Sequence, residues 1–332
     1  MSERVVTLAV VGLGYWGPNL ARNVIAIPGT RLAWCCDTDA DLLAQAATLF
    51  PGVARSDSLV EVLEDPDLDG VLLATPVATH GELAARVLGA GKHCFVEKPM
   101  ATSTADAQSL IDAAAAADRV LMVGHLLEYH PGVRALAKLI EDGELGEIHY
   151  IYSNRLNLGQ LRADENALWS LGAHDVAVIL GLAGGEEPTE LQARGECYMR
   201  EGIEDVVFAF MRFESGLSAH LHLSWLDPHK ERRITVVGSR RMATFDDMEI
   251  ERKLTVYDKG FDERTDSWGE YIARSGASTS PQIPPTEPLR LELEHFAYCI
   301  RSGATPRSDG ASGLRVVRVL EGLQAQLEAS RR

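Results

Sequence analysis

The glycine turn Gly12-Leu-Gly14-Tyr-Trp-Gly17 constrains this chain most, because it directly follows an apolar, β-branched run over residues 5–11. A helical pattern over residues 19–26 comes next, so the turn has a strand–turn–helix context. In this context Gly12 allows a tight turn, Gly14 lets backbone N–H groups approach a pyrophosphate, and Gly17 lets the helix pack closely on the strand. The helix N-terminus favours negative charge. The sequence therefore predicts a dinucleotide-binding domain at its N-terminus.

A second apolar run, residues 31–36, ends in Asp37, twenty residues after Gly17. An acid at this place can accept hydrogen bonds from an adenosine ribose and would repel a 2′-phosphate. No arginine follows closely, so NAD is favoured over NADP. The alternative is that Asp37 caps the following helix. The predicted cofactor contacts here are Gly12, Gly14, Tyr15, Trp16, Gly17, Asp37 and Thr38.

Lys98 stands where another apolar run ends, in the sequence Val96-Glu97-Lys98-Pro99. Proline restricts the residue before it to extended geometry, which presents Lys98 at the carboxyl end of a strand. Ligands bind at that edge of open α/β sheets. A lysine beside an acid can hold a substrate hydroxyl, tune a neighbouring base, or form an ion pair with no further role. Glu97 and Lys98 are also predicted to contact the cofactor.

The loop after the strand near residues 69–74 should reach the same sheet edge, and its Thr75, Pro76 and His80 are predicted to line the nicotinamide side. His80 could instead cap the following helix. Strands and helices alternate as far as His125, which favours a doubly wound parallel sheet. We place the NAD-binding domain at residues 1–125.

Residues 126–332 read as a second domain in which strand patterns follow one another, many separated by turns. This order predicts an α+β domain with a large, mostly antiparallel, open-faced sheet. Its free face is partly apolar, so we expect a homodimer or homotetramer formed through it. Residues 273–288 are rich in serine and proline and are predicted to form a long surface loop. Residues 287–302 and 311–331 are predicted terminal helices.

A second set of polar residues precedes and enters a helix predicted over residues 166–181. Asn166, Ser170 and His174 would lie along one helix face, with Asp175 about 100° away. A histidine can take a hydroxyl proton at neutral pH, the step that accompanies hydride loss from a secondary alcohol. His174 could equally be a structural histidine, and Asp175 could orient it or cap a neighbouring element.

Taken together, the glycine turn, the loop from Thr75 to His80, the Glu97-Lys98-Pro99 strand end and the Gly172-Ala-His174-Asp175 helix resemble the glucose-fructose oxidoreductase/inositol dehydrogenase (Gfo/Idh/MocA) family. The C-terminal pattern from Leu293 to Pro306 is also similar to it. The resemblance implies NAD(P)-dependent oxidation or reduction at a sugar or polyol CH–OH group, with Lys98 assisting at the hydroxyl and His174 as acid/base. Many members carry an aspartate where this chain has Ser170, so either Asp175 orients His174 or the proton follows another route.

Within the family, residues 154–169 are similar to bacterial members that oxidise the 3-hydroxyl of UDP-N-acetylglucosamine or a related uronic acid. The substrate contacts expected on this basis are His125, Arg155, Asn157, Arg162, Asn166, Trp169 and Ser170. The arginines Arg155 and Arg162 could hold a diphosphate with bidentate geometry. The alternatives are surface ion pairs for both arginines, and a free sugar or inositol dehydrogenase or a ketosugar reductase. A non-catalytic NAD-binding sensor or scaffold is the alternative from another class.

Charge and hydropathy exclude several partners. The formal net charge is −16, which argues against nucleic acid or an anionic membrane as a partner. No run of 18 apolar residues offers a membrane span, and we see no export signal after Met1. Five cysteines without a C-x-x-C pair are typical of a reduced, cytoplasmic protein. We expect no metal centre.

Overall fold

The computed structural model describes residues 4–159, 161–162, 165–263 and 271–331. The chain divides into two compact units, and each is described by itself below. Unit 1 comprises Met1–Tyr129 with Thr286–Arg318, and unit 2 comprises His130–Pro285 with Val319–Arg332. In the described ranges no helix is long and apolar enough to cross a membrane.

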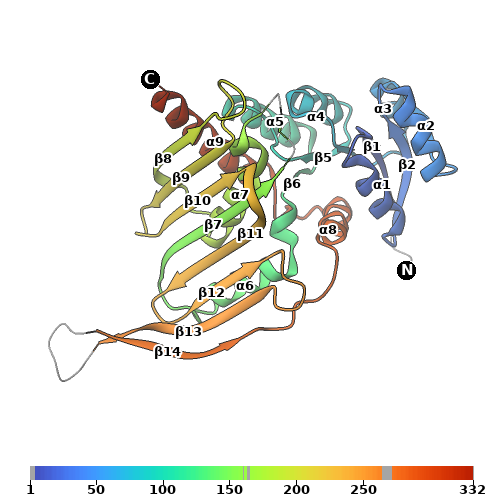
Figure 1. Ribbon diagram of the computed structural model, residues 1–332. Helices are drawn as coiled ribbons and strands as arrows, with labels where there is room; N and C mark the ends of the chain where they lie inside the picture. Colours follow the sequence, from blue (N-terminus) through green and yellow to red (C-terminus); the bar gives the residue numbers. More distant parts are fainter. Residues whose placement is uncertain (1–3, 160, 163–164, 264–270, 332) are drawn as a thin grey trace. The chain divides into compact units, whose positions relative to one another are not determined.

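Unit 1 contains a six-stranded sheet of order β3-β2-β1-β4-β5-β6 (Figure 1). Its strands are parallel, which confirms the predicted doubly wound parallel sheet. Its strands are β1 (Val6–Val11), β2 (Thr30–Cys36), β3 (Ala54–Ser56), β4 (Gly70–Leu73), β5 (His93–Glu97) and β6 (Leu121–Gly124). Its helices are α1 (Gly17–Ala26), α2 (Ala40–Leu49), α3 (Leu59–Leu63), α4 (His80–Gly89), α5 (Thr104–Ala117) and α8 (Pro288–Ser302), with short 3-10 turns at Val77–Thr79 and Leu126–Tyr129.

Helices cover both faces of this sheet because its strands are apolar on both sides. Val11, Leu73 and Val96 pack in one core cluster, which also takes in buried residues of α3, α4 and α5. Alternate residues, such as Val10 and Leu72, pack in the other cluster, with α1 and α8. Near-continuous apolar strands are typical of parallel sheets with two covered faces.

Unit 2 is built on an eight-stranded sheet of order β14-β13-β12-β11-β7-β10-β9-β8 (Figure 1). Its strands are β7 (Ile148–Leu158), β8 (Pro188–Glu196), β9 (Val206–Phe213), β10 (Ser218–Ser224), β11 (Leu226–Gly238), β12 (Met242–Asp246), β13 (Leu254–Glu263) and β14 (Tyr271–Thr279). Among the described strand pairs of this eight-stranded sheet, only β7 and β10 pair in parallel, and the other pairs are antiparallel. The mostly antiparallel sheet confirms the predicted fold class. Helices α6 (Pro131–Glu141) and α7 (Ala173–Leu182) pack against it.

Aromatic and histidine side chains stack across β7, β10 and β9. The rings of Tyr152 and His220 lie 5.3 Å apart between centroids, and those of Phe208 and His222 lie 4.4 Å apart. Phe208 is 54% exposed. Ser153, the neighbour of Tyr152, points instead to α7, so the stacks occupy the face that α7 does not cover. Association of copies through this face stays a prediction.

Three boundaries differ from the sequence predictions. Strand β14 occupies the start of the predicted loop 273–288, because β13 supplies its hydrogen-bond partners although the strand itself is polar and exposed. The predicted helix over residues 166–181 is interrupted by a π-helical turn, Leu168–Gly172, before α7 begins. Residues 286–318 belong to unit 1 rather than to the predicted second domain, because Leu293 and Phe296 of α8 pack in its core. Helix α9 (Gly310–Ser330) extends across the division between the units.

Candidate active site

The three glycines of the turn in unit 1 differ in what a side chain would meet there. Gly12 has a φ of +90°, and a Cβ on it would lie 2.6 Å from the carbonyl carbon of Ala74. A Cβ on Gly17 would lie 1.9 Å from the carbonyl oxygen of Gly12. Around Gly14, by contrast, a Cβ would meet no described atom within 4 Å. The chain itself therefore requires Gly12 and Gly17, whereas Gly14 leaves open space where a ligand can approach the backbone.

Helix α1 begins directly at this turn. Trp16 is its N-cap residue, and no side chain of the described residues caps its first amides. The backbone N–H groups at a helix N-terminus favour an anion. The open space at Gly14, at the N-terminus of α1, fits the pyrophosphate of a dinucleotide. Tyr15 is 92% exposed and stacks on Trp16.

Asp37 follows β2 and contacts the same turn. Its carboxylate accepts hydrogen bonds from the backbone N–H of Leu13, at 2.6 Å, and of Asp39, at 2.9 Å. The N-cap of α2 is Asp39, which accepts from the backbone N–H groups of Asp41 and Leu42. The alternative that Asp37 caps this helix is therefore wrong. Because each carboxylate oxygen has further lone pairs, Asp37 fits the predicted ribose acceptor. Thr38 beside it is exposed.

Glu97 and Lys98 stand at the carboxyl end of β5. The indole N–H of Trp16 donates to Glu97 Oε1 at 2.5 Å, and the backbone N–H of Lys98 donates to Oε2 at 3.3 Å. Burial raises the pKa of Glu97 to about 7, although the positive charge of Lys98 lowers it. The strand end thus holds a carboxyl group that titrates near neutral pH beside the predicted catalytic lysine.

His125 follows β6 at the same sheet edge. It is 1% exposed, and neither ring nitrogen has a hydrogen-bond partner among the described residues. Burial, together with the positive charge of Lys98, lowers its pKa to about 3. The imidazole is therefore neutral at physiological pH. Buried polar groups are rarely left unsatisfied, and the contact of this ring with a substrate stays a prediction.

The loop after β4 is fixed by His80. Its Nδ1 lies 2.8 Å from the carbonyl oxygen of Pro99, and its Nε2 lies 2.9 Å from that of Thr75. The ring is buried, and burial lowers its pKa. Both nitrogens thus connect the loop of Thr75 and Pro76 to the chain after Lys98. The N-cap of α4 is Thr79, so His80 does not cap this helix, and its place on the nicotinamide side stays a prediction.

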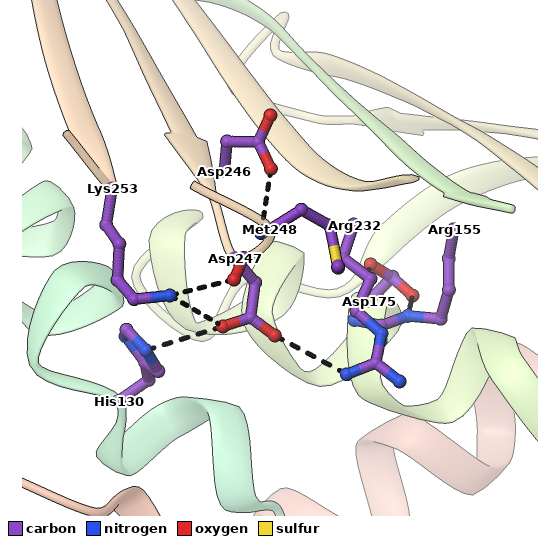
Figure 2. A network of polar contacts seen from close by, with 8 residues as sticks. All are labelled: His130, Arg155, Asp175, Arg232, Asp246, Asp247, Met248 and Lys253. Carbon is purple, nitrogen blue, oxygen red and sulfur yellow. Dashed lines mark hydrogen bonds and ion pairs between the residues drawn. The ribbon is translucent and has the colours of Figure 1, made fainter. Parts of the chain in front are cut away.

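In unit 2, Asp175 forms a buried cluster with β7. Arg155 Nε donates to Asp175 Oδ2 at 2.5 Å, and the hydroxyl of Ser153 donates to Oδ1 at 2.6 Å (Figure 2 draws the arginine contact). Arg155 is 8% exposed and Asp175 is 1% exposed. The sequence interpretation placed Arg155 at a substrate phosphate and Asp175 beside His174. The structure instead pairs them with each other, because a charge this deep in a protein requires a partner.

Near this cluster, three cationic or basic groups converge on Asp247 (Figure 2). Its carboxylate lies 3.4 Å from Lys253 Nζ, 3.6 Å from His130 Nε2 and 3.5 Å from a guanidinium nitrogen of Arg232. These three groups lower its pKa, against the effect of burial. Sequence analysis missed this network, because its members come from four separate places along the chain and form no local motif. Arg232 pairs in register with Arg155 across β11 and β7.

The side-chain amide of Asn166 forms hydrogen bonds within unit 2. Its Nδ2 donates to Glu204 at 2.7 Å and to Gln324 at 2.9 Å, and its Oδ1 accepts from the backbone N–H of Trp169 at 3.2 Å. These contacts use the amide within the protein, which differs from the substrate contact predicted for it.

Four further predicted residues of unit 2 precede or follow Asn166 in the sequence. Ser170 lies in the π-helical turn, and His174 lies in the first turn of α7. Because a π-turn contains an extra residue, Asn166, Ser170 and His174 no longer follow the simple spacing of one helix face. Asn157 is half-buried near the end of β7. Arg162 is exposed and forms an ion pair with Glu165 at 3.1 Å.

The predicted reaction residues are thus divided by the fold: Lys98 belongs to unit 1, and His174 and Asp175 belong to unit 2. Within the described ranges, no group of three His, Cys, Asp or Glu side chains could hold a metal ion. Unit 1 by itself combines a parallel doubly wound sheet, an open glycine turn at a helix N-terminus and an acid at the end of β2. These features define unit 1 as a dinucleotide-binding domain.

Comparison with known proteins assigns the family. Residues 6–125 match the model described as the oxidoreductase family, NAD-binding Rossmann fold, and residues 133–244 match that of the GFO/IDH/MocA C-terminal domain. The chain belongs to the GFO/IDH/MocA oxidoreductase family, as the sequence resemblance implied. It is an NAD-dependent oxidoreductase with the two-part architecture of that family.

Individual relatives match along nearly the whole chain. UDP-N-acetylglucosamine 3-dehydrogenase of Acidithiobacillus ferrooxidans is 27% identical over 96% of this chain and 96% of its own. A solved structure of that enzyme matches with a TM-score of 0.84, covering 97% of each chain. The NAD(+)-dependent scyllo-inositol 2-dehydrogenase of Bacillus subtilis is 26% identical over 92% of this chain and 89% of its own.

Proposed function

We propose that this protein oxidises a secondary hydroxyl of a sugar by transferring hydride to NAD. The most favoured substrate is a UDP-N-acetylhexosamine, or its uronic acid, oxidised at the 3-hydroxyl. The observation that carries the proposal is Lys98, held at the carboxyl end of β5 next to the turn that fits NAD. The full-length similarity to a UDP-N-acetylglucosamine 3-dehydrogenase supports the substrate class.

In this proposal, NAD supplies the hydride acceptor when it is bound. Gly12, Gly14 and Gly17 leave room for its pyrophosphate, and Asp37 accepts hydrogen bonds from its adenosine ribose. Lys98 polarises the substrate hydroxyl, which weakens the O–H bond, and His174 removes the proton as the hydride leaves. The roles of Lys98 and His174 follow from the family resemblance.

The structure changes which arginine we propose for a substrate diphosphate. The guanidinium of Arg155 is buried and neutralised by Asp175. The side chain of Arg162 is 56% exposed, and its ion pair with Glu165 leaves its other N–H groups for a bidentate phosphate contact. We therefore propose Arg162 as the phosphate-binding residue, and Arg155 as a residue that stabilises unit 2.

A second candidate is the oxidation of inositol or a free sugar, which the similarity to a scyllo-inositol 2-dehydrogenase favours. Such a substrate carries no diphosphate, so Arg162 would have no part in binding it. A ketosugar reductase would use the same residues in the opposite direction. The two substrate classes therefore predict different effects of an Arg162 substitution on KM.

The experiment combines a substrate panel with one arginine variant. Purified protein is mixed with NAD and UDP-N-acetylglucosamine, its uronic acid, free sugars or inositol, and NADH absorbance is followed. We expect a rise with a UDP-sugar, a large loss of turnover in Lys98→Met, and a KM for that sugar raised about tenfold or more in Arg162→Ala, equivalent to about 1.4 kcal/mol. Arg194→Ala, at an exposed arginine on β8, serves as the matched control. Equal KM values in both arginine variants, or a rise with free sugars alone, would contradict the nucleotide-sugar proposal.

A further inference from the structure

Trp16 connects the cofactor turn to β5, the strand that ends at Glu97. Its backbone carbonyl accepts from the N–H groups of Asn19, at 2.9 Å, and Leu20, at 3.3 Å, which begins helix α1. Its indole N–H donates to Glu97 Oε1 at 2.5 Å. A single residue therefore sets the N-terminus of α1 and reaches the end of β5. The N-cap residue Trp16 makes these contacts through its backbone and forms no side-chain cap hydrogen bond.

Glu97 is held from three directions within unit 1. Oε1 accepts from Trp16, and Oε2 accepts from the backbone N–H of Lys98 at 3.3 Å. On a third side lies Gly124 at the end of β6, where a Cβ would be only 3.0 Å from the Glu97 carboxyl carbon. The absence of a side chain at this position leaves the carboxyl group just enough space. Its placement thus depends on β5, β6 and the glycine turn together.

We propose that Glu97 is a positioning residue, whose carboxylate form holds Trp16 and the start of α1 in the arrangement that binds NAD, and whose protonation weakens that binding. A hydrogen bond to an ionised acceptor is roughly twice as strong as one to a neutral acceptor. The same carboxylate orients the backbone of Lys98, so the cofactor turn and the lysine are positioned by one group. The proposal depends on NAD binding and not on the identity of the sugar.

The charged and titratable groups around Glu97 make it the group that responds near neutral pH. Burial raises its pKa to about 7, with Lys98 acting in the opposite direction. His125, after β6, has its pKa lowered to about 3 and is neutral in this range. Glu292, on α8, has a pKa raised well above its usual value by burial, Glu97 and Glu128. As pH falls from 8.5 to 6, Glu97 therefore becomes protonated and NAD is expected to bind more weakly.

The test is a calorimetric titration of NAD into the full-length protein at several pH values between 6 and 8.5, without substrate. For the wild type we expect Kd to rise about tenfold toward pH 6, the change that corresponds to one pKa unit of coupling. Glu97→Gln should show a Kd that is independent of pH and close to the wild-type value at pH 6. Glu64→Gln, at an exposed acid on the chain after α3, should behave as the wild type.

A second variant removes the donor rather than the acceptor. Trp16→Phe keeps the aromatic ring but cannot donate, so its Kd at pH 8.5 should rise about tenfold and lose most of its pH dependence. Circular dichroism identifies any variant that does not fold. If one variant does not fold, the pH dependence of Kd in the wild type and in the other variant tests the proposal. A wild-type Kd that does not change with pH, or a folded Glu97→Gln or Trp16→Phe variant with the wild-type profile, would overturn the proposal. An inactive sugar panel would leave these titrations unaffected, so this proposal can fail independently of the proposed substrate.

Discussion

Asp37 in unit 1 and Asp175 in unit 2 show two ways of holding a carboxylate. Asp37 accepts hydrogen bonds from the backbone N–H groups of Leu13 and Asp39, so both contacts come from the main chain. Asp175 is held by the side chains of Arg155 and Ser153, and the pair is buried. A carboxylate held by backbone amides can still accept from a ligand. One that neutralises a buried guanidinium is part of the protein interior.

The largest effect is expected from Asp175→Ala. The substitution leaves the Arg155 guanidinium buried without its carboxylate, and breaking a buried pair from one side costs about 3–5 kcal/mol. Urea denaturation, followed by circular dichroism, should therefore show a strongly lowered midpoint. Asp175→Asn keeps an oxygen acceptor and should lose less stability.

Asp142→Ala provides the matched control, because Asp142 forms an exposed ion pair with Lys138 at 2.9 Å. Exposed pairs contribute about 0–1 kcal/mol, so its midpoint should hardly move. If Asp175 served chiefly to orient His174, Asp175→Ala would keep its denaturation midpoint and lose turnover alone. That result would contradict the comparison between the two carboxylates.

The same contrast explains what the sequence could predict. At the glycine turn, the chemistry depends on backbone geometry over a few residues, so Gly12, Gly17 and the acid at the end of β2 could be identified from spacing alone. The fold class also followed from the alternation of strands and helices. Even here, the bond between Trp16 and Glu97 was not foreseen, because the two residues are 81 positions apart.

In unit 2 the interactions depend on tertiary packing. Arg155 and Asp175 each looked like a functional residue, and only the packing of α7 on β7 reveals that they neutralise each other. Asn166 contacts Glu204 and Gln324, which are 38 and 158 positions away. The π-turn has no sequence signature of its own and changed the helix face assumed for His174. Spacing rules describe one element at a time, so pairs formed between elements escaped them.

Glu292 in α8 is a third kind of carboxyl group, which differs from both Asp37 and Asp175. It is 0% exposed, and neither of its oxygens has a hydrogen-bond partner among the described residues. Burial, together with Glu97 and Glu128, raises its pKa well above the usual value. The folded state therefore binds this proton more tightly than the unfolded state, in which the pKa of glutamate is about 4.3. Its contribution to stability is complete below that pH and is lost as pH rises through the folded-state pKa.

Glu292→Gln keeps the shape of the side chain and removes this titration. We expect the melting temperature of the variant to exceed that of the wild type at pH 8, with a difference that shrinks toward pH 4.5. Scanning calorimetry at four or five pH values measures this difference. Because Glu97 and Glu292 interact, the difference between the two proteins includes the effect of Glu292 on Glu97 as well as its own titration. Parallel curves for the two proteins would show that Glu292 has a partner in solution that holds its charge.

Gly14→Ala should change stability least, and it tests whether the glycine turn is shaped for a ligand or for the chain. A Cβ there meets no described atom within 4 Å, so the free energy of unfolding should stay within about 0.5 kcal/mol of the wild type. The methyl group occupies the space through which the pyrophosphate would approach, so Kd for NAD should rise about tenfold or more, or about 1.4 kcal/mol. Gly17→Ala is the matched comparison, since its Cβ would lie 1.9 Å from the Gly12 carbonyl oxygen and should reduce both stability and NAD binding. If Gly14→Ala bound NAD as the wild type does, the open space at Gly14 would not be the pyrophosphate site. The backbone of that edge would then be shaped by packing alone, like the interior around Asp175.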